Sequence, residues 1–309
     1  MRERVSASAP GKIILFGEHA VVYGRPAIAV PVSHVQATAT ITPHEHGVII
    51  RSINTGESIA IEAADPDHPL AAITRLTLAA FNIRSADLAI TVESSVPIAA
   101  GLGSGAAVSV AVVRALAGWY QRAIDAETVS RLAYEVERLH HGTPSGIDNT
   151  VIAYHRPVYF VRGQPIQTFS VARPFSVVIA NTGRPSLTKI AVGDVRRGWE
   201  AQRERYEAWF DQIGAIVQQA RSAIESGAVE QLGPLMDQNQ ALLRNIDVSS
   251  PELEHLIAVA KRAGAAGAKL VGGGRGGNLI AMIDASHRDT VAAALQAAGA
   301  TQVIITTVQ

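Results

Sequence analysis

The strongest constraint on the fold is a glycine-rich segment, PIAAGLGSGA at residues 97–106, which separates two regular patterns. The alternating run before it, residues 86–93, predicts a strand, and the Ala- and Val-rich run after it predicts a helix over about 103–121. Glycine lets the backbone come close to a ligand, and the following helix offers unpaired N–H groups and a positive dipole end. We therefore expect an anion at this junction, although the segment lacks the Gly-Lys-Ser/Thr ending of the common nucleotide-binding loop.

The remaining patterns predict an α+β fold, because strands and helices interleave without a steady strand–helix–strand alternation. Asp125 is predicted to be the N-cap of a helix, and Glu137 is predicted to lie at the border of the buried stripe of that helix. Ser250 and Pro251 are predicted to begin another helix. Strand-rich sequence gives way to helix-rich sequence near residues 165–185, so we expect one domain over 1–170 and a second over 171–309. Further strands are predicted at 27–32, 35–42, 47–52, 58–63, 157–161, 165–171, 175–181, 278–284 and 301–308, and further helices at 69–81, in most of 190–264 and at 287–299.

Composition narrows the function classes. The chain of 309 residues has 27 basic and 27 acidic residues, which gives no reason to expect nucleic acid or an anionic membrane as its main partner. It contains no cysteine, which excludes disulfides and thiolate metal sites. The sequence shows neither a signal-peptide pattern nor an uninterrupted apolar run of membrane-spanning length, so we expect a cytoplasmic protein. Only four of the basic residues are lysines, Lys12, Lys189, Lys261 and Lys269.

Five clusters of residues suit chemistry: 9–27, 97–106, 137–148, 181–189 and 267–278. Each has a structural alternative when taken singly. The two glycine-rich segments could be a cap and a turn, Asp148 a helix cap, Glu137 a solvated helix residue and His19 a turn residue. Two glycine clusters in one chain also suit a polyphosphate held from both sides. The five clusters together favour the functional interpretation.

These clusters resemble the motifs of a known family, in its motif order and across nearly the whole chain. PGKIILFGEHAVVYGRPA, from residue 10 onward, resembles the N-terminal signature of mevalonate kinases, and ERLHHGTPSGIDN is similar to their segment with the catalytic aspartate. Residues 97–106 resemble the phosphate loop of the wider superfamily of galactokinases, homoserine kinases, mevalonate kinases and phosphomevalonate kinases (GHMP kinases). The segment that leads into the second glycine-rich cluster is likewise similar to the family's helical segment that leads into its third motif.

The resemblance implies two α+β domains with ATP in the cleft between them. In this superfamily the phosphate loop wraps the ATP phosphates with backbone N–H groups and needs no lysine of its own. It also implies Mg²⁺ as a cofactor, with the Ser104 hydroxyl and the Glu137 carboxylate as ligands, in line with the preference of Mg²⁺ for oxygen. The residues expected to bind the nucleotide are Pro97, Ala100, Gly101, Leu102, Gly103, Ser104, Gly105 and Ala106.

The resemblance further implies the catalytic groups. Asp148 matches the base that takes the proton of the substrate hydroxyl, and Lys12 matches the cation beside it. Glu18 and His19 resemble the pair that contacts mevalonate, so substrate binding is expected from Lys12, Glu18, His19 and Asp148. Thr188 and Lys189 lie in a loop that in relatives is near the γ-phosphate, which is a looser match.

The third motif departs from the family pattern. Arg275 interrupts a run that is usually all glycine, and Val271 stands where threonine is common. The Arg275 guanidinium has two alternatives: it turns inward to the phosphates, or it points outward from the loop. We favour the outward direction, because Lys12 and magnesium already supply positive charge in the family's arrangement.

The activity implied is phosphorylation of the primary hydroxyl of mevalonate by ATP, a step of isoprenoid precursor synthesis. Two alternatives stay open: another kinase of the superfamily, acting on phosphomevalonate or a sugar, and a non-catalytic sensor that binds ATP and a metabolite. A phosphorylated acceptor would require extra cations, whereas the first motif offers only Lys12 and Arg25. Relatives are often homodimers, so a homodimer is compatible with the resemblance.

Overall fold

The chain divides into two compact units, and two long strands each belong partly to one unit and partly to the other. The computed structural model describes residues 3–97, 100–141, 144–186 and 188–309, with the backbone alone at 140 and 141. One compact unit contains the chain up to Lys12 together with Pro31–His155, and the other contains Ile13–Val30 together with Arg156–Gln309. The predicted domains, 1–170 and 171–309, differ from these units, because β1 (Val5–Phe16) and β2 (Ala27–Pro43) each begin in one unit and end in the other.

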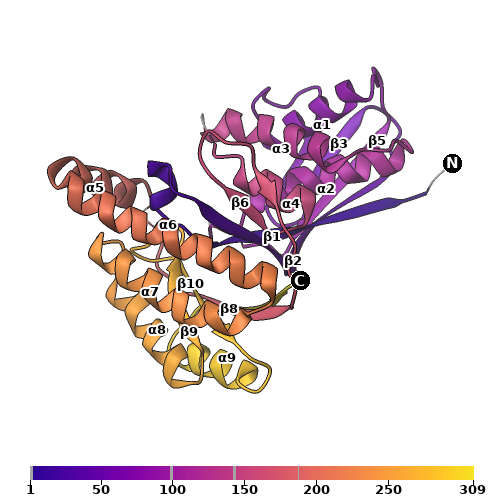
Figure 1. Cartoon of the computed structure of the whole chain (residues 1–309). Coiled ribbons are helices and arrows are strands. Elements are labelled where there is room, and N and C mark those ends of the chain that lie inside the picture. Colours follow the sequence, from indigo (N-terminus) through magenta and orange to yellow (C-terminus); the bar gives the residue numbers. More distant parts are fainter. Residues whose placement is uncertain (1–2, 98–99, 142–143, 187) are drawn as a thin grey trace. The chain divides into compact units, whose positions relative to one another are not determined.

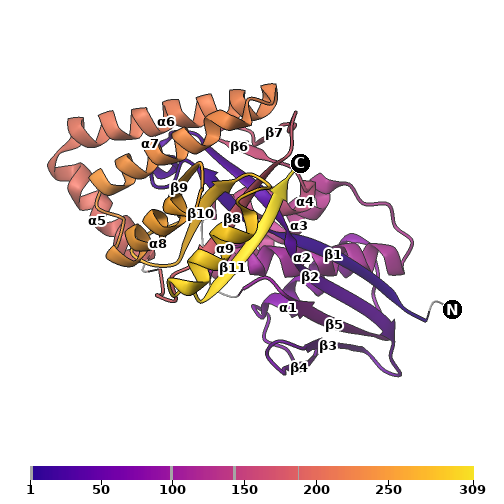
Figure 2. The same ribbon diagram turned by 90° about the horizontal axis from the view of Figure 1, so that it is seen from below.

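In the first unit a sheet is joined to a cluster of four helices (Figures 1 and 2). The strand order is β4-β3-β5-β2, and β1 pairs with β2. The β3–β5 pair is parallel, whereas β3–β4 and β2–β5 are antiparallel. Helix α2 packs against β5 and against the other three helices. The elements are β1 (Val5–Phe16), β2 (Ala27–Pro43), β3 (Val48–Ser52), β4 (Ser58–Ala60), α1 (Pro69–Ala80), β5 (Leu88–Ser94), α2 (Ser104–Trp119), α3 (Ala126–His141) and α4 (Ile147–Tyr154).

The second unit contains an antiparallel four-stranded sheet in the order β11-β8-β10-β9. Helices α8 and α9 pack on each other and on this sheet, while α5, α6 and α7 pack in succession. The first residues of β2 pair with β6, which pairs with β7. The elements are η1 (Ala20–Tyr23), β6 (Val158–Phe160), β7 (Gln167–Thr168), β8 (Phe175–Asn181), α5 (Thr188–Ala201), α6 (Arg203–Ser226), η2 (Val229–Gln231), α7 (Leu232–Asn245), α8 (Pro251–Arg262), β9 (Gly267–Val271), β10 (Asn278–Ile283), α9 (Arg288–Ala297) and β11 (Gln302–Val308).

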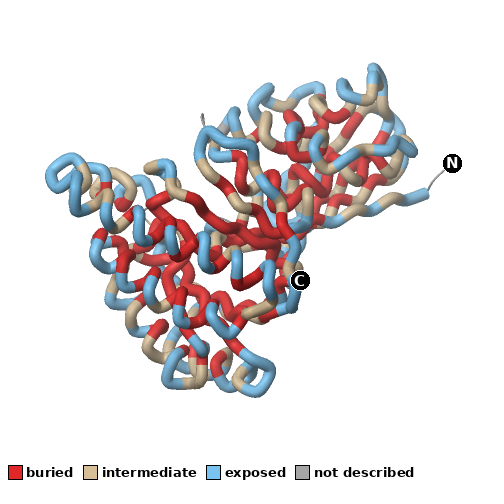
Figure 3. Tube along the Cα trace, viewed as in Figure 1, coloured by how far each residue is buried: buried red, intermediate tan, exposed pale blue. Residues whose placement is uncertain are grey.

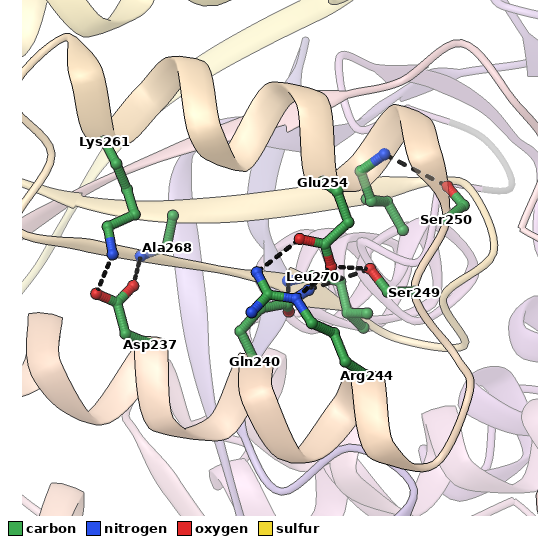
Figure 4. Close-up of polar contacts among 10 residues, drawn as sticks. Asp237, Gln240, Arg244, Ser249, Ser250, Glu254, Lys261, Ala268 and Leu270 are labelled. Atoms are coloured by element: carbon green, nitrogen blue, oxygen red, sulfur yellow. Dashed lines mark hydrogen bonds and ion pairs between the residues drawn. The ribbon is translucent and has the colours of Figure 1, made fainter.

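The edge strand β9 is held by side chains of α7 and α8 (Figure 4). The Ala268 N–H donates to Asp237 Oδ1 at 3.1 Å, and the Leu270 N–H donates to Gln240 Oε1 at 2.9 Å. An edge strand otherwise exposes such groups for pairing with another chain. Glu254 holds Gln240 in turn by accepting its amide N–H at 2.8 Å. The network is completed by Arg244, Ser249 and Lys261.

Most predicted elements are confirmed. Asp125 caps α3 by accepting the Thr128 N–H, and Ser250 caps α8 by accepting the Leu253 N–H. The predicted stripe of α3 is buried: Val129, Leu132, Ala133 and Val136 (Figure 3 shows the buried parts of the trace). Three results differ from the prediction. Residues 27–43 form one strand rather than two, and the strand expected at 165–171 is reduced to β7, Gln167–Thr168. In addition, β9 occupies part of the expected glycine-rich loop, because α7 satisfies its outer N–H groups.

The α+β prediction is confirmed: β3–β5 is parallel, whereas β2–β5, β2–β6, β3–β4, β6–β7 and the three pairs of the β11-β8-β10-β9 sheet are antiparallel. Across the described residues, no helix combines the length and the apolar character needed to cross a bilayer.

Candidate active site

The predicted phosphate loop lies against β1 at the start of α2. The Lys12 N–H donates to Leu102 O at 2.9 Å, and a Cβ on Gly11 would lie 3.1 Å from the same oxygen. Gly103, with φ 72°, is the N-cap of α2, so Ser104 is the first helical residue. The first N–H groups of a helix have no partner within it, which makes this end suitable for an anion. Residues 98–99 of the loop lie outside the described residues.

Lys12 and Asp148, the predicted catalytic pair, form an ion pair in the first unit. Lys12 Nζ is 3.0 Å from Asp148 Oδ1, and the side chains are 8% and 28% exposed. Lysine is thus held against the carboxylate while the carboxylate keeps access to solvent. A partly exposed carboxylate beside a buried ammonium is suited to accept a proton from a hydroxyl group and to stabilise the alkoxide that forms.

Helix α4 positions Asp148 in its first turn. Gly146 is its N-cap at φ 80°, and Ile147, next to Asp148, is buried. The following residues fasten the helix to α3: Asn149 Nδ2 donates to the carbonyl and the hydroxyl oxygen of Ser130, and the Thr150 hydroxyl lies 3.2 Å from that same hydroxyl. The alternative of a simple helix cap therefore does not apply to Asp148. Residues 142–143 of the preceding turn lie outside the described residues.

Glu137 lies on α3, close enough to the ion pair for charge to affect it. Burial, together with the nearby Asp148 carboxylate, raises the pKa of its carboxyl group from 4.5 to about 7, and Lys12 acts in the opposite direction. A buried carboxylate beside a second carboxylate is stabilised by a cation. The alternative of a solvated helix residue is thereby disfavoured for Glu137.

The residues present fit a magnesium ion that arrives with phosphate. Among the described residues, no group of three or more His, Asp or Glu side chains could hold a metal ion. Mg²⁺ usually takes one or two protein oxygens and completes its shell with phosphates and water. Glu137 supplies a carboxylate whose charge is poorly compensated, and Ser104 supplies a hydroxyl at the helix end.

Gly103 is predicted to be essential to the placement of Lys12. Its left-handed φ of 72° disfavours alanine, and a Cβ there would lie 2.9 Å from Lys12 Cγ. We expect Gly103→Ala to lower kcat by roughly 10- to 100-fold, because a shift of about 1 Å in a catalytic group has effects of this size. The measurement is steady-state turnover together with thermal unfolding.

Gly101→Ala is the matched control. Gly101 has nearly the same φ, 73°, but a Cβ there would meet nothing within 4 Å. It carries the backbone strain without the displacement of Lys12, so its kcat should fall less. Equal losses in the two variants would contradict the role given to Gly103.

In the second unit, Glu18 and His19 are held by two different partners. Glu18 is ion-paired with Lys269 of β9, and the two side chains are 1% and 0% exposed. Lys269 Nζ also donates to Leu270 O at 2.7 Å. With its carboxylate buried in this pair, Glu18 holds the chain on which His19 follows; its contact with substrate stays a prediction.

His19 is a neutral residue in a strained backbone conformation. Its φ is 59°, and burial lowers the pKa of its imidazole from 6.5 to about 4. Nε2 lies 3.1 Å from the carbonyl oxygen of Gly273, which can only accept, so Nε2 carries the proton. In the neutral ring Nδ1 is then an acceptor, suited to a hydroxyl donor.

Arg275, the arginine of the third motif, points to two carboxylates. The Arg275 guanidinium is ion-paired with Asp194 and with Asp247, and its side chain is 23% exposed. Its direction agrees with the outward alternative, although it is bound to neighbours rather than extended into solvent. Thr188 begins α5 and lies against Gly273, where a Cβ would come within 2.5 Å of its Oγ1. Leu187, beside it, lies outside the described residues.

Sequence reasoning missed the partner of Glu18. Lys269 was noted only as one of four lysines and as part of a glycine-rich cluster, and nothing in the sequence joins it to residue 18. The scarcity of lysine was the available signal, because a chain that otherwise uses arginine keeps lysine where a compact ammonium is required.

Comparisons with known proteins agree over almost the whole chain. The family described as GHMP kinases N terminal domain matches residues 68–156, and the family GHMP kinases C terminal matches residues 220–301. A mevalonate kinase of Pyrococcus abyssi is 35% identical over 98% of this chain and 96% of its own length. One of Thermococcus sibiricus is 33% identical over 97% and 95%. The crystal structure of L. major mevalonate kinase in complex with R-mevalonate is similar with a TM-score of 0.84 and 30% identity, covering 98% of this chain and 95% of that chain.

Proposed function

Because this chain belongs to the mevalonate kinase family of the GHMP kinases, we propose that it transfers the γ-phosphoryl group of ATP to the primary hydroxyl of mevalonate. The products are 5-phosphomevalonate and ADP. The observation that carries the proposal is the ion pair of Lys12 with Asp148, in the same unit as the glycine-rich entry to α2. The first unit thus contains both a base for the substrate hydroxyl and a helix N-terminus suited to phosphate.

In the proposed reaction Asp148 accepts the hydroxyl proton as the oxygen attacks the γ-phosphorus. The new O–P bond forms while the bond between the γ-phosphorus and the bridging oxygen breaks, and ADP departs with that electron pair. Asp148 then returns its proton to water. Lys12 stabilises the developing alkoxide, while N–H groups at the start of α2 donate to phosphate oxygens.

Ser104 and Glu137 are the residues that would hold Mg²⁺ beside the phosphates. When bound, the ion supplies positive charge that offsets the charge of the phosphate oxygens. Glu137 must be ionised to act as a ligand, and a cation lowers its raised pKa toward the ordinary range.

The environment of Arg25 favours an acceptor without a phosphate. Arg25 is the cation of the first motif other than Lys12, and its donors are occupied by Glu207, by Asp211 at 2.8 Å and by Tyr23 O at 2.8 Å. A phosphomevalonate site would require cations with unused donors. The proposed mevalonate contacts are His19, through Nδ1, and Lys12 with Asp148 at the hydroxyl.

The function is tested by ADP release from the purified chain with ATP, Mg²⁺ and one of four acceptors: mevalonate, phosphomevalonate, homoserine or galactose. We expect the highest kcat/KM with mevalonate. A higher kcat/KM with another acceptor would contradict the proposal and indicate that the chain has a different activity within the superfamily. ATP binding without turnover of any acceptor would support the sensor alternative instead.

The metal ligands are tested by magnesium titration of turnover. Glu137→Gln and Ser104→Ala should each raise the Mg²⁺ concentration for half-maximal rate, and Glu137→Gln more so, because it removes a charge as well as weakening a ligand. Glu135→Gln is the matched control, since Glu135 lies on the same helix in an exposed ion pair with Arg138. Titration curves of both variants that overlay the wild type would remove these residues from the metal site.

Two further expectations remain predictions for this chain. They are its cytoplasmic location and its assembly as a homodimer.

A further inference from the structure

Arg275 occupies a backbone conformation that favours glycine. Its φ is 56°, and Gly272, Gly274, Gly276 and Gly277 around it also have positive φ. A residue with a side chain in this region costs on the order of 1–3 kcal/mol unless its surroundings compensate. The presence of arginine here therefore requires contacts that offset the strain.

The side chain and backbone of Arg275 supply those contacts. The guanidinium is ion-paired with Asp194 of α5, and hydrogen bonding to it lowers the pKa of the Asp194 carboxyl. It also binds the loop after α7: Nε and Nη2 donate to Asp247 O at 3.1 and 3.0 Å, and Nη2 lies 3.1 Å from Asp247 Oδ2. The Arg275 N–H donates to Val248 O at 2.8 Å. One residue thus joins the glycine-rich loop to α5 and to the segment between α7 and α8.

The same loop is bound by the segment that leads into α5. The Gly277 N–H donates to Arg184 O at 2.8 Å, and the Ser186 hydroxyl donates to Gly274 O at 3.1 Å. Gly273 lies so close to Thr188 that a Cβ would not fit between them. The carbonyl of Gly273 in turn accepts the hydrogen bond of His19. The position of Gly273, and with it the anchor of His19, therefore depends on how this loop is held.

We propose that Arg275 is a positioning residue that holds the glycine-rich loop and α5 as one body before substrate binds. Without the arginine, a loop composed almost entirely of glycine would sample many conformations, and ordering it would oppose binding. The guanidinium removes that cost in advance, so Gly273 keeps His19 oriented for the acceptor. This inference rests on the proposed function, because His19 is there a mevalonate contact.

The expected effect is on the binding of mevalonate rather than on the chemical step. In Arg275→Gly the KM for mevalonate should rise by about 3- to 10-fold while kcat stays within about twofold. Glycine adopts the same φ without strain, so this variant should fold. Asp194→Asn removes the ion pair from the α5 side and should give a similar rise, and the double variant should be no worse than either single one. Arg197→Ala is the control, because Arg197 pairs with Asp194 from within α5 and is 72% exposed.

Hydrogen exchange of the ligand-free protein is the second measurement. Amides of residues 272–277 and 188–195 should exchange at least about tenfold faster in Arg275→Gly than in the wild type, because the contacts that close this region are lost. Wild-type KM together with wild-type exchange in Arg275→Gly would overturn the proposal. So would a fall in kcat beyond tenfold at unchanged KM, which would place the guanidinium at the phosphates. If the wild type does not phosphorylate mevalonate, the proposed function fails, while the exchange measurement still decides on the role of Arg275.

Discussion

Replacing Asp148 by asparagine is expected to lower kcat by at least about 10²-fold, the scale observed when a general base and its charge are lost. Asparagine keeps the size of the side chain and an oxygen that Lys12 can approach. Helix α4 is anchored by Asn149 and Thr150, so the fold should survive the substitution. The measurement is turnover at saturating ATP and mevalonate, with thermal unfolding and ATP binding measured on the same preparation.

Lys12→Met should reduce kcat by a comparable factor. The two groups form one ion pair at 3.0 Å and serve one step, so the double variant should lose little more than the more affected single variant. Activity near that of the wild type in folded Asp148→Asn would exclude Asp148 as the base. Fully additive losses would instead indicate that Lys12 and Asp148 act in separate steps.

Replacing Lys269 by methionine is expected to lower the free energy of unfolding by about 3–5 kcal/mol, the usual effect of removing one partner of a buried ion pair. Lys269 is 0% exposed and Glu18 1%, so the variant leaves the Glu18 carboxylate buried without this ammonium. The methionine has similar length and fills the same space. Urea unfolding of the two proteins measures the difference.

Two further variants make this result specific to the buried pair. Lys261→Met removes an ion pair with Asp237 at a side chain that is 45% exposed, and should change stability by no more than about 1 kcal/mol. Adding Glu18→Gln to Lys269→Met removes the remaining buried negative charge and should recover part of the lost stability. A double variant less stable than Lys269→Met, or equal effects at the two lysines, would show that the Glu18–Lys269 charge pair does not account for the loss.

Local features were predictable because their causes lie within a few residues of one another. The Asp125 and Ser250 caps each bind an N–H group three residues ahead, and the stripe of α3 follows from helical periodicity. The glycine-rich entry to α2 was predictable for the same reason. The resemblance to known motifs named Lys12 and Asp148 as partners, although the residues between them carry no local signal for their contact.

Other features depend on contacts between distant parts of the chain. Strand β9 was expected to be loop, since its glycine-flanked sequence is ambiguous until Asp237 and Gln240 of α7 satisfy its outer N–H groups. The Glu18–Lys269 pair joins residues 251 positions apart, and Arg275 reaches Asp194 across 81. The sequence by itself determined most of the helices and strands, the glycine-rich entry to α2, and which side chains can carry charge. Only the tertiary structure decided which of those charges meet, because burial between packed elements selects the partner of each charge.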